Sequence, residues 1–135
     1  MVSESTESIP LDIHKEVALA RVQDARMIWE ANAFSWQDHW IDCSPQARVA
    51  TAALMAMSGE PFPYRTRGKK DDPLDRWLIL TGVALEVLLT LMNNHANLAN
   101  RLHYDTDQKI LRARSLDELR TIPMPFPPSL ESFNP

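Results

Sequence analysis

The longest run of helical periodicity in the chain covers residues 73–103. Its hydrophobic stripe consists of Leu74, Trp77, Leu78, Thr81, Leu85, Leu88, Leu89, Met92, Ala96, Ala99 and Leu102. These positions recur mostly three or four residues apart for about eight turns, so they fall on one face of an α-helix. A helix of this length needs partners along its whole apolar face, and the pattern therefore predicts the central element of the core.

Two shorter helices are expected before it. Pro10 suits the first turn of a helix, where a missing N–H removes no hydrogen bond, and it begins a periodic segment over residues 10–33. Ser44 followed by Pro45 combines a hydroxyl cap with a first-turn proline and predicts a helix over residues 45–58. Both helices are expected to pack with the long one.

The remaining segments carry weaker signals. A short helix is expected over residues 107–113, and Ser115 begins a capping box that starts another turn or two. Residues 60–72 hold prolines, a glycine and basic side chains, so they are expected to form an exposed loop. No hairpin signal is found and residues that favour strands rarely cluster, so helix is favoured throughout.

These segments together predict an all-α fold. We expect a small helical bundle of three to five helices with one long central helix and an extended proline-rich C-terminal tail. The 135 residues are divided into an extended or disordered N-terminus (1–9), a bundle domain (10–121) and the tail (122–135). The core is expected to form around Trp29, Leu54, Trp77, Leu78, Leu85, Leu88 and Leu89.

Charge and cysteine content argue against several classes of protein. A formal net charge of −4 disfavours general binding to nucleic acid or to an anionic membrane. Cys43 is the only cysteine, so no intramolecular disulfide can form, and a cytoplasmic setting is expected. The N-terminus lacks the pattern of a secretory signal, and the most apolar run is too short to span a bilayer. The Walker pattern is absent, so nucleotide hydrolysis has no support, and no cofactor is expected.

Asp38, His39 and Cys43 form the densest group of reactive side chains. His39 and Cys43 are four residues apart and share one face if this interval is helical. Nitrogen and sulfur ligands at this spacing can hold zinc or another transition metal, although a complete site needs further ligands. The alternative is that His39 caps a turn or packs on a tryptophan and that Cys43 is a small hydrophobic residue.

A basic cluster within residues 60–72 is a candidate anion-binding site. It consists of Arg65, Arg67, Lys69 and Lys70. Such a cluster suits an anion or an acidic partner. Two aspartates follow it directly and partly cancel its charge, so a solvated loop is the alternative.

The later part of the long helix carries a row of asparagines. Asn93, Asn97 and Asn100 fall on one face together with Tyr104. Asparagine is a mediocre helix former, so this concentration favours hydrogen bonding to a partner. A hydrated helix end is the alternative.

The proline-rich tail cannot form a packed helix. It carries the apolar side chains of Met124, Phe126, Leu130 and Phe133. Leaving these side chains in water is unfavourable, so the tail is expected to dock. Its site is either the helices of this chain or a groove on a partner protein.

The stretch LTGVALEVLLTLM resembles the second core helix of HEPN-type helical domains. The residues that carry the resemblance are Gly82, Ala84, Glu86 and Leu89. The nuclease motif of these domains, an arginine followed a few residues later by a histidine, is absent, since the nearest pair is Arg101 and His103. The resemblance therefore implies a helical domain that lacks the nuclease motif.

Three functions are compatible with these features. The preferred hypothesis is a non-catalytic helical subunit or adaptor that binds a larger protein, or another copy of itself, through the tail and its helical faces. One alternative is a small helical enzyme or metal-binding protein that uses the region of Asp38, His39 and Cys43. The other is a nucleic-acid-associated helical domain, HEPN-like without the nuclease motif.

Overall fold

The computed structural model describes residues 9–57 and 59–126. Four helices and two small sheets form this part of the chain. The helices are α2 (Leu11–Asn32), α3 (Pro45–Met55), α4 (Gly82–Arg112) and α5 (Leu116–Arg120). The strands are β1 (Ser35–Trp36), β2 (His39–Trp40), β3 (Phe62–Arg65) and β4 (Trp77–Leu80).

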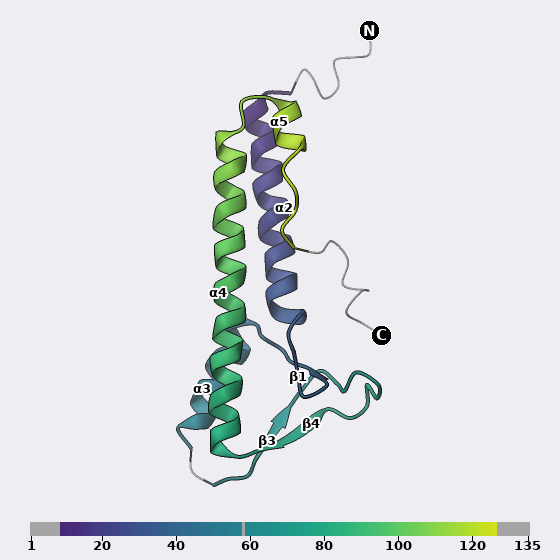
Figure 1. The fold of residues 1–135 in the computed structure, drawn as a ribbon, viewed down its shortest axis with the longest axis vertical. Coiled ribbons are helices and arrows are strands. Elements are labelled where there is room, and N and C mark those ends of the chain that lie inside the picture. Colours follow the sequence, from purple (N-terminus) through teal and green to yellow (C-terminus); the bar gives the residue numbers. More distant parts are fainter. Residues whose placement is uncertain (1–8, 58, 127–135) are drawn as a thin grey trace.

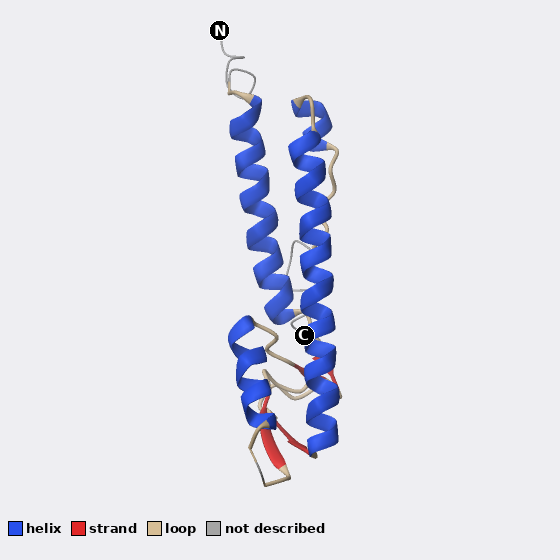
Figure 2. Cartoon of the chain, turned by 90° about the vertical axis from the view of Figure 1, so that its left-hand side faces the viewer, coloured by secondary structure: helices blue, strands red, loops and turns tan. Residues whose placement is uncertain are grey.

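The molecule is a rod built around α4, the longest helix (Figure 1). α2 runs antiparallel beside the later part of α4, whereas α3 packs beside its beginning (Figure 2). α5 lies next to the start of α2, at one end of the rod, and both sheets lie at the other. We call these the helical end and the sheet end, and α4 connects them.

The prediction of an all-α fold is wrong, because two antiparallel two-stranded sheets accompany the helices. β3 lies in the segment that was expected to be a loop, and β4 in the expected first turns of the long helix. In β3, Phe62 and Tyr64 are buried, while Pro63 and Arg65 are exposed. This alternation has the period of two that a strand with one buried face requires.

A tight hairpin connects α2 to the loop before α3. β1 and β2 pair in antiparallel register, and Gln37 (φ 51) and Asp38 (φ 63) form the turn between them. Positive φ at both central residues gives a turn whose twist matches that of the flanking strands. Backbone hydrogen bonds then join β2 to residues 67–70, so the two small sheets hold one another in place.

The bounds of α4 differ from the prediction at both ends. The helix begins at Gly82, where Thr81 Oγ1 accepts a hydrogen bond from the N–H three residues further on. The helix was expected to begin at residue 73, but a turn precedes β4 there, in which the carboxylate of Asp72 accepts a hydrogen bond from a backbone N–H. α4 continues to Arg112, so the separate helix expected over residues 107–113 is its last part.

The start signals of α3 and α5 are confirmed, whereas Pro10 is the N-cap residue of α2 and precedes its first turn. Pro45 begins α3, and Ser44 Oγ accepts a hydrogen bond from Ala47 N at 3.2 Å. Ser115 Oγ accepts from Glu118 N at 3.1 Å and begins α5, as the capping box predicted. These caps work because the side-chain oxygens satisfy N–H groups that have no partner within the helix.

Two clusters of buried side chains fill the rod. The sheet-end core consists of Ile41, Cys43, Phe62, Tyr64, Leu80, Leu85, Leu88 and Met92. The helical-end core consists of Val22, Ala99, Ile110, Ala113, Leu119 and Phe126. A single helix, α4, contributes to both cores, which is the central role predicted for it.

The predicted core residues are only partly buried. Leu85 and Leu88 are fully buried. The half-buried members are Trp29, Leu54, Leu78 and Leu89. Trp77 is 52% exposed, and its assignment to the core is corrected. It lies on the outer face of β4, since a strand replaces the helical turn that would have directed it inward.

A buried carboxylate links α2 to α3. Glu30 is 5% exposed and accepts hydrogen bonds from Arg26 Nε at 3.0 Å and from Arg48 Nη1 at 2.6 Å. Arg48 also donates to the backbone carbonyl of Cys43 at 2.7 Å. Two guanidinium groups thus compensate the desolvated charge of Glu30, and the network fixes the connection between the two helices.

Candidate functional site

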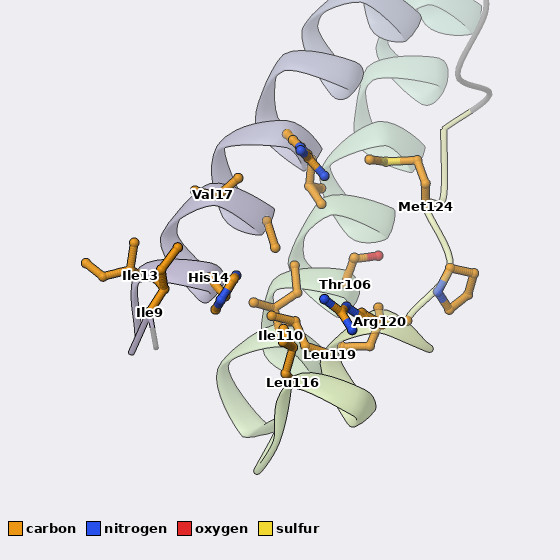
Figure 3. Close-up of a pocket in the computed structure, with 15 residues that line it drawn as sticks. Ile9, Ile13, His14, Val17, Thr106, Ile110, Leu116, Leu119, Arg120 and Met124 are labelled. Atoms are coloured by element: carbon orange, nitrogen blue, oxygen red, sulfur yellow. The ribbon is translucent and has the colours of Figure 1, made fainter. Parts of the chain in front are cut away.

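A groove of about 600 Å³ opens at the helical end of the rod (Figure 3). Its walls come from α2, the end of α4, α5 and the first residues of the tail. The lining residues are Ile9, Ile13, His14, Val17, Ala18, Arg21, Val22, Thr106, Ile110, Leu116, Leu119, Arg120, Ile122, Pro123 and Met124. We call this the distal groove. In Figure 3, Ile13 and Val17 stand on one side of it and Met124 on the other.

The charged groups that line the distal groove are all basic. They are Arg21, Arg120 and the ionisable His14, and no carboxylate is among the lining residues. Arg21 and Arg120 are exposed, and neither forms an ion pair within the part of the chain that the structure describes. The groove therefore combines an apolar surface with basic side chains that have no ion-pair partner among the described residues.

The tail contributes to this end of the molecule in two ways. Phe126 is fully buried and packs on Trp29, with the ring centroids 5.4 Å apart. Its predicted role as an anchor for a partner is therefore corrected, because the ring is part of this chain's own core. Met124 is 40% exposed at the groove. Leu130 and Phe133 lie outside the described residues.

The candidate metal ligands do not come together. His39 is in β2, where Nδ1 hydrogen-bonds Thr66 Oγ1 at 2.7 Å. Cys43 lies in the following loop, and Sγ donates to the backbone carbonyl of Met92 at 3.3 Å. The hairpin stands in place of the helix on which His39 and Cys43 would have shared one face. Across residues 9–57 and 59–126, no group of three or more His, Cys, Asp or Glu side chains could hold a metal ion.

Burial also shifts the pKa of Cys43 and of His95. Desolvation raises the pKa of the Cys43 thiol from 9.0 to about 11, with a smaller opposing effect from Arg48. Desolvation lowers the pKa of His95, whose ring stacks on Trp29 at 4.2 Å between centroids. The Cys43 thiol is therefore held in its protonated, weakly nucleophilic form, and the half-buried imidazole of His95 is held in its neutral form.

The asparagine row lies on the exposed side of α4. Asn93, Asn97 and Asn100 are all exposed. Asn100 Oδ1 accepts a hydrogen bond from Arg26 Nη1 at 3.1 Å, which links α4 to α2. Binding of a partner by this row stays a prediction.

The predicted basic cluster is divided by the fold. Arg65 and Arg67 line an open cleft of about 420 Å³ with Asp42, Thr66 and Arg76. We call this the arginine cleft. The predicted anion-binding residues Lys69 and Lys70 are not among its lining residues. Lys70 Nζ instead lies over the ring of a tryptophan in β2, 5.0 Å from its centroid. Arg76, which adjoins β4, was missed because it is distant in sequence.

The prediction from sequence also missed the distal groove. The periodicity of residues 10–33 predicted a helix that packs with the long helix through one face. Ile9, Ile13 and Val17 form a second apolar row, with a spacing of four residues. All three are between 41% and 47% exposed. An apolar row on the outer side of an amphipathic helix is the signal that could have identified this surface.

No protein-family model, curated protein or solved structure matches this chain. Among the described residues, no helix combines the length and the apolar character that crossing a membrane requires.

Proposed function

We propose that the chain is a non-catalytic adaptor that binds an acidic amphipathic helix of a partner protein in the distal groove. The observation that carries this proposal is the combination of an apolar lining with only basic charges. Helix-in-groove recognition uses apolar anchors about one turn apart, while charged side chains beside them set the orientation and the choice of partner.

The rim of the groove supports the part of the proposal that concerns the apolar face of the bound helix. Ile9, Ile13, Val17 and Met124 are each 40% to 47% exposed, although all four are large apolar side chains. Burying such surface is worth about 25 cal/mol per Å², so a helix that covers this rim gains affinity at each contact. A contiguous exposed apolar surface with a polar border is typical of an interaction site.

The charged side chains of the groove support the acidic character of the proposed partner helix. Arg21 and Arg120 stand on different helices, α2 and α5, on the lining of the same groove. Carboxylates on the flanks of a bound helix could pair with both guanidinium groups, whereas lysines there would be repelled. A helix with acidic flanks is therefore preferred over a basic one.

The groove also needs little rearrangement to bind. Its walls are held by the helical-end core, because Val22, Ile110 and Leu119 line the groove and are also buried members of that core. The first tail residues are fixed beside it, because the adjacent Phe126 is packed in that core. A preformed groove loses less conformational entropy on binding, and this favours an adaptor whose binding surface is already built.

A peptide-display selection against the immobilised chain tests the proposal. We expect enrichment of sequences with apolar residues at helical spacing and Asp or Glu between them. Val17→Asp should abolish this enrichment, because it places a charge on the apolar rim. Val49→Asp is the matched control, since Val49 is 70% exposed on α3, outside the groove lining.

The outcome of this selection decides between classes of partner. Enrichment that is lost with Val17→Asp and retained with Val49→Asp supports the adaptor. Enrichment of basic or purely polar peptides, or equal enrichment by both variants, contradicts it.

A further inference from the structure

The arginine cleft lies apart from the distal groove and shares no lining residue with it. It brings Arg65, Arg67 and Arg76 to one opening of about 420 Å³ at the sheet end. Asp42 is the only carboxylate among its lining residues. We infer that this cleft binds the dianionic phosphate of a phosphomonoester.

Among the residues that the structure describes, the three guanidinium groups find partners for few of their hydrogen-bond donors. Each arginine has five N–H donors. Arg76 uses Nε to donate to a backbone carbonyl at 3.1 Å. Arg67 has one long contact, 3.9 Å from Nη1 to Asp42 Oδ1. Arg65 Cζ lies over the ring of Trp77, 5.8 Å from its centroid, and this cation–π contact is not a hydrogen bond.

The backbone that carries these side chains is fixed on both sides. Thr66 N donates to the carbonyl of Arg76 at 2.7 Å, which extends the pairing of β3 with β4. Arg67 N donates to the carbonyl of Trp40 at 2.7 Å, which connects the same segment to β2. Gly68 (φ 121) lies in the turn that follows. Glycine is favoured there, because a Cβ atom at this position would lie 2.8 Å from a backbone oxygen. The arginines are thus presented from a rigid support, which reduces the cost of binding.

The charge of the cleft selects the type of anion. Three guanidinium groups and one carboxylate give a local charge of +2. A phosphomonoester carries a charge of about −2 at neutral pH, whereas a phosphodiester carries −1. The planar guanidinium group of arginine can donate two parallel hydrogen bonds to two phosphate oxygens, a geometry that the ammonium group of lysine cannot match. The formal charge of −4 on the whole chain further disfavours the extended backbone of a nucleic acid.

Chemical-shift titration with methyl phosphate at constant ionic strength, following the arginine Nε–H resonances, tests this inference. Arg67→Gln and Arg76→Gln should each weaken binding by about tenfold, the loss typical of a charge-assisted hydrogen bond. Arg101→Gln is the matched control, since Arg101 is exposed on α4 and lies outside the cleft. It should leave the affinity unchanged.

A variant with the opposite effect strengthens the test. Asp42→Asn should tighten the binding of methyl phosphate by a few fold, because it removes the carboxylate that competes for Arg67. The asparagine carbonyl can still accept the hydrogen bond that Asp42 Oδ1 receives from Ser44 N at 3.0 Å. This variant is therefore expected to keep the local fold.

Further ligands separate the possible sources of the phosphate. Tighter binding of a phosphoserine peptide than of methyl phosphate identifies a phosphorylated protein, and equal binding identifies a small phosphorylated compound. Both results support the site. The inference is overturned if dimethyl phosphate or a single-stranded oligonucleotide binds as tightly as methyl phosphate. It is also overturned if Arg101→Gln weakens binding as much as Arg67→Gln, or if no ligand gives saturable shifts.

Discussion

At the scale of single residues, Cys43 shows how burial determines reactivity. Its pKa of about 11 lies well above the ordinary value of 9.0 for a cysteine thiol, so the thiolate fraction at pH 7.5 falls by about 100-fold. We therefore expect iodoacetamide to leave Cys43 unmodified in the folded chain and to modify it rapidly in denaturant. Mass spectrometry after timed labelling measures this difference. Fast stoichiometric labelling of the folded chain would restore the enzyme hypothesis.

His95 supplies a pH dependence with a defined sign. Burial lowers the pKa of His95 below its ordinary value of 6.5. As the pH falls past 6.5, the imidazole therefore binds a proton in the unfolded chain more readily than in the folded chain. The free energy of unfolding should therefore decrease when the pH is lowered from 7.5 to 5. Urea denaturation at both pH values measures the change. His95→Gln should reduce this decrease.

At the scale of elements, the turn between β1 and β2 is a point of local strain. Gln37 and Asp38 both adopt positive φ, which costs ordinary residues about 1 kcal/mol each. Replacing the pair with Asn-Gly, the preferred sequence for this turn, should raise the free energy of unfolding by about 1 kcal/mol. Chemical denaturation provides the measurement. A loss of stability would show that the present side chains are needed in the turn.

Helices were predictable from sequence because their signals are local. The hydroxyl caps of Ser44 and Ser115 and the apolar spacing along α4 lie within a few residues of the structure they specify. β3 and β4 were missed for the opposite reason. β3 contains a proline, and the apolar residues of β4 continue the helical spacing of the residues that follow. The pairing of β3 with β4 also depends on contacts across the intervening loop. The alternation of Phe62 and Tyr64 with exposed neighbours was the available signal.

The candidate sites were less predictable than the fold, because each combines distant segments. The distal groove joins residues near 9–22 with residues 106–124. The arginine cleft joins Asp42 to Arg65, Arg67 and Arg76 through the pairing of strands that were not predicted. Sequence spacing identified Arg65 and Arg67, but it could not show that Lys69 and Lys70 would lie elsewhere.

At the scale of the whole molecule, α4 separates two surfaces of different chemistry. The helical end offers an apolar groove with basic charges, and the sheet end offers a cluster of arginines. The two sites share no residue and belong to different cores. We therefore expect that substitutions at one site leave binding at the other unchanged, as in an adaptor with two independent contacts.

The central claim is that the distal groove selects acidic amphipathic helices. Its most direct test is fluorescence anisotropy with a labelled amphipathic peptide of about four turns, made once with Glu and once with Lys on its polar face. The wild-type chain should bind the Glu peptide about tenfold more tightly, and the double variant Arg21→Glu and Arg120→Glu should reverse this preference. Equal affinity for both peptides, or no saturable binding of either, would contradict the account.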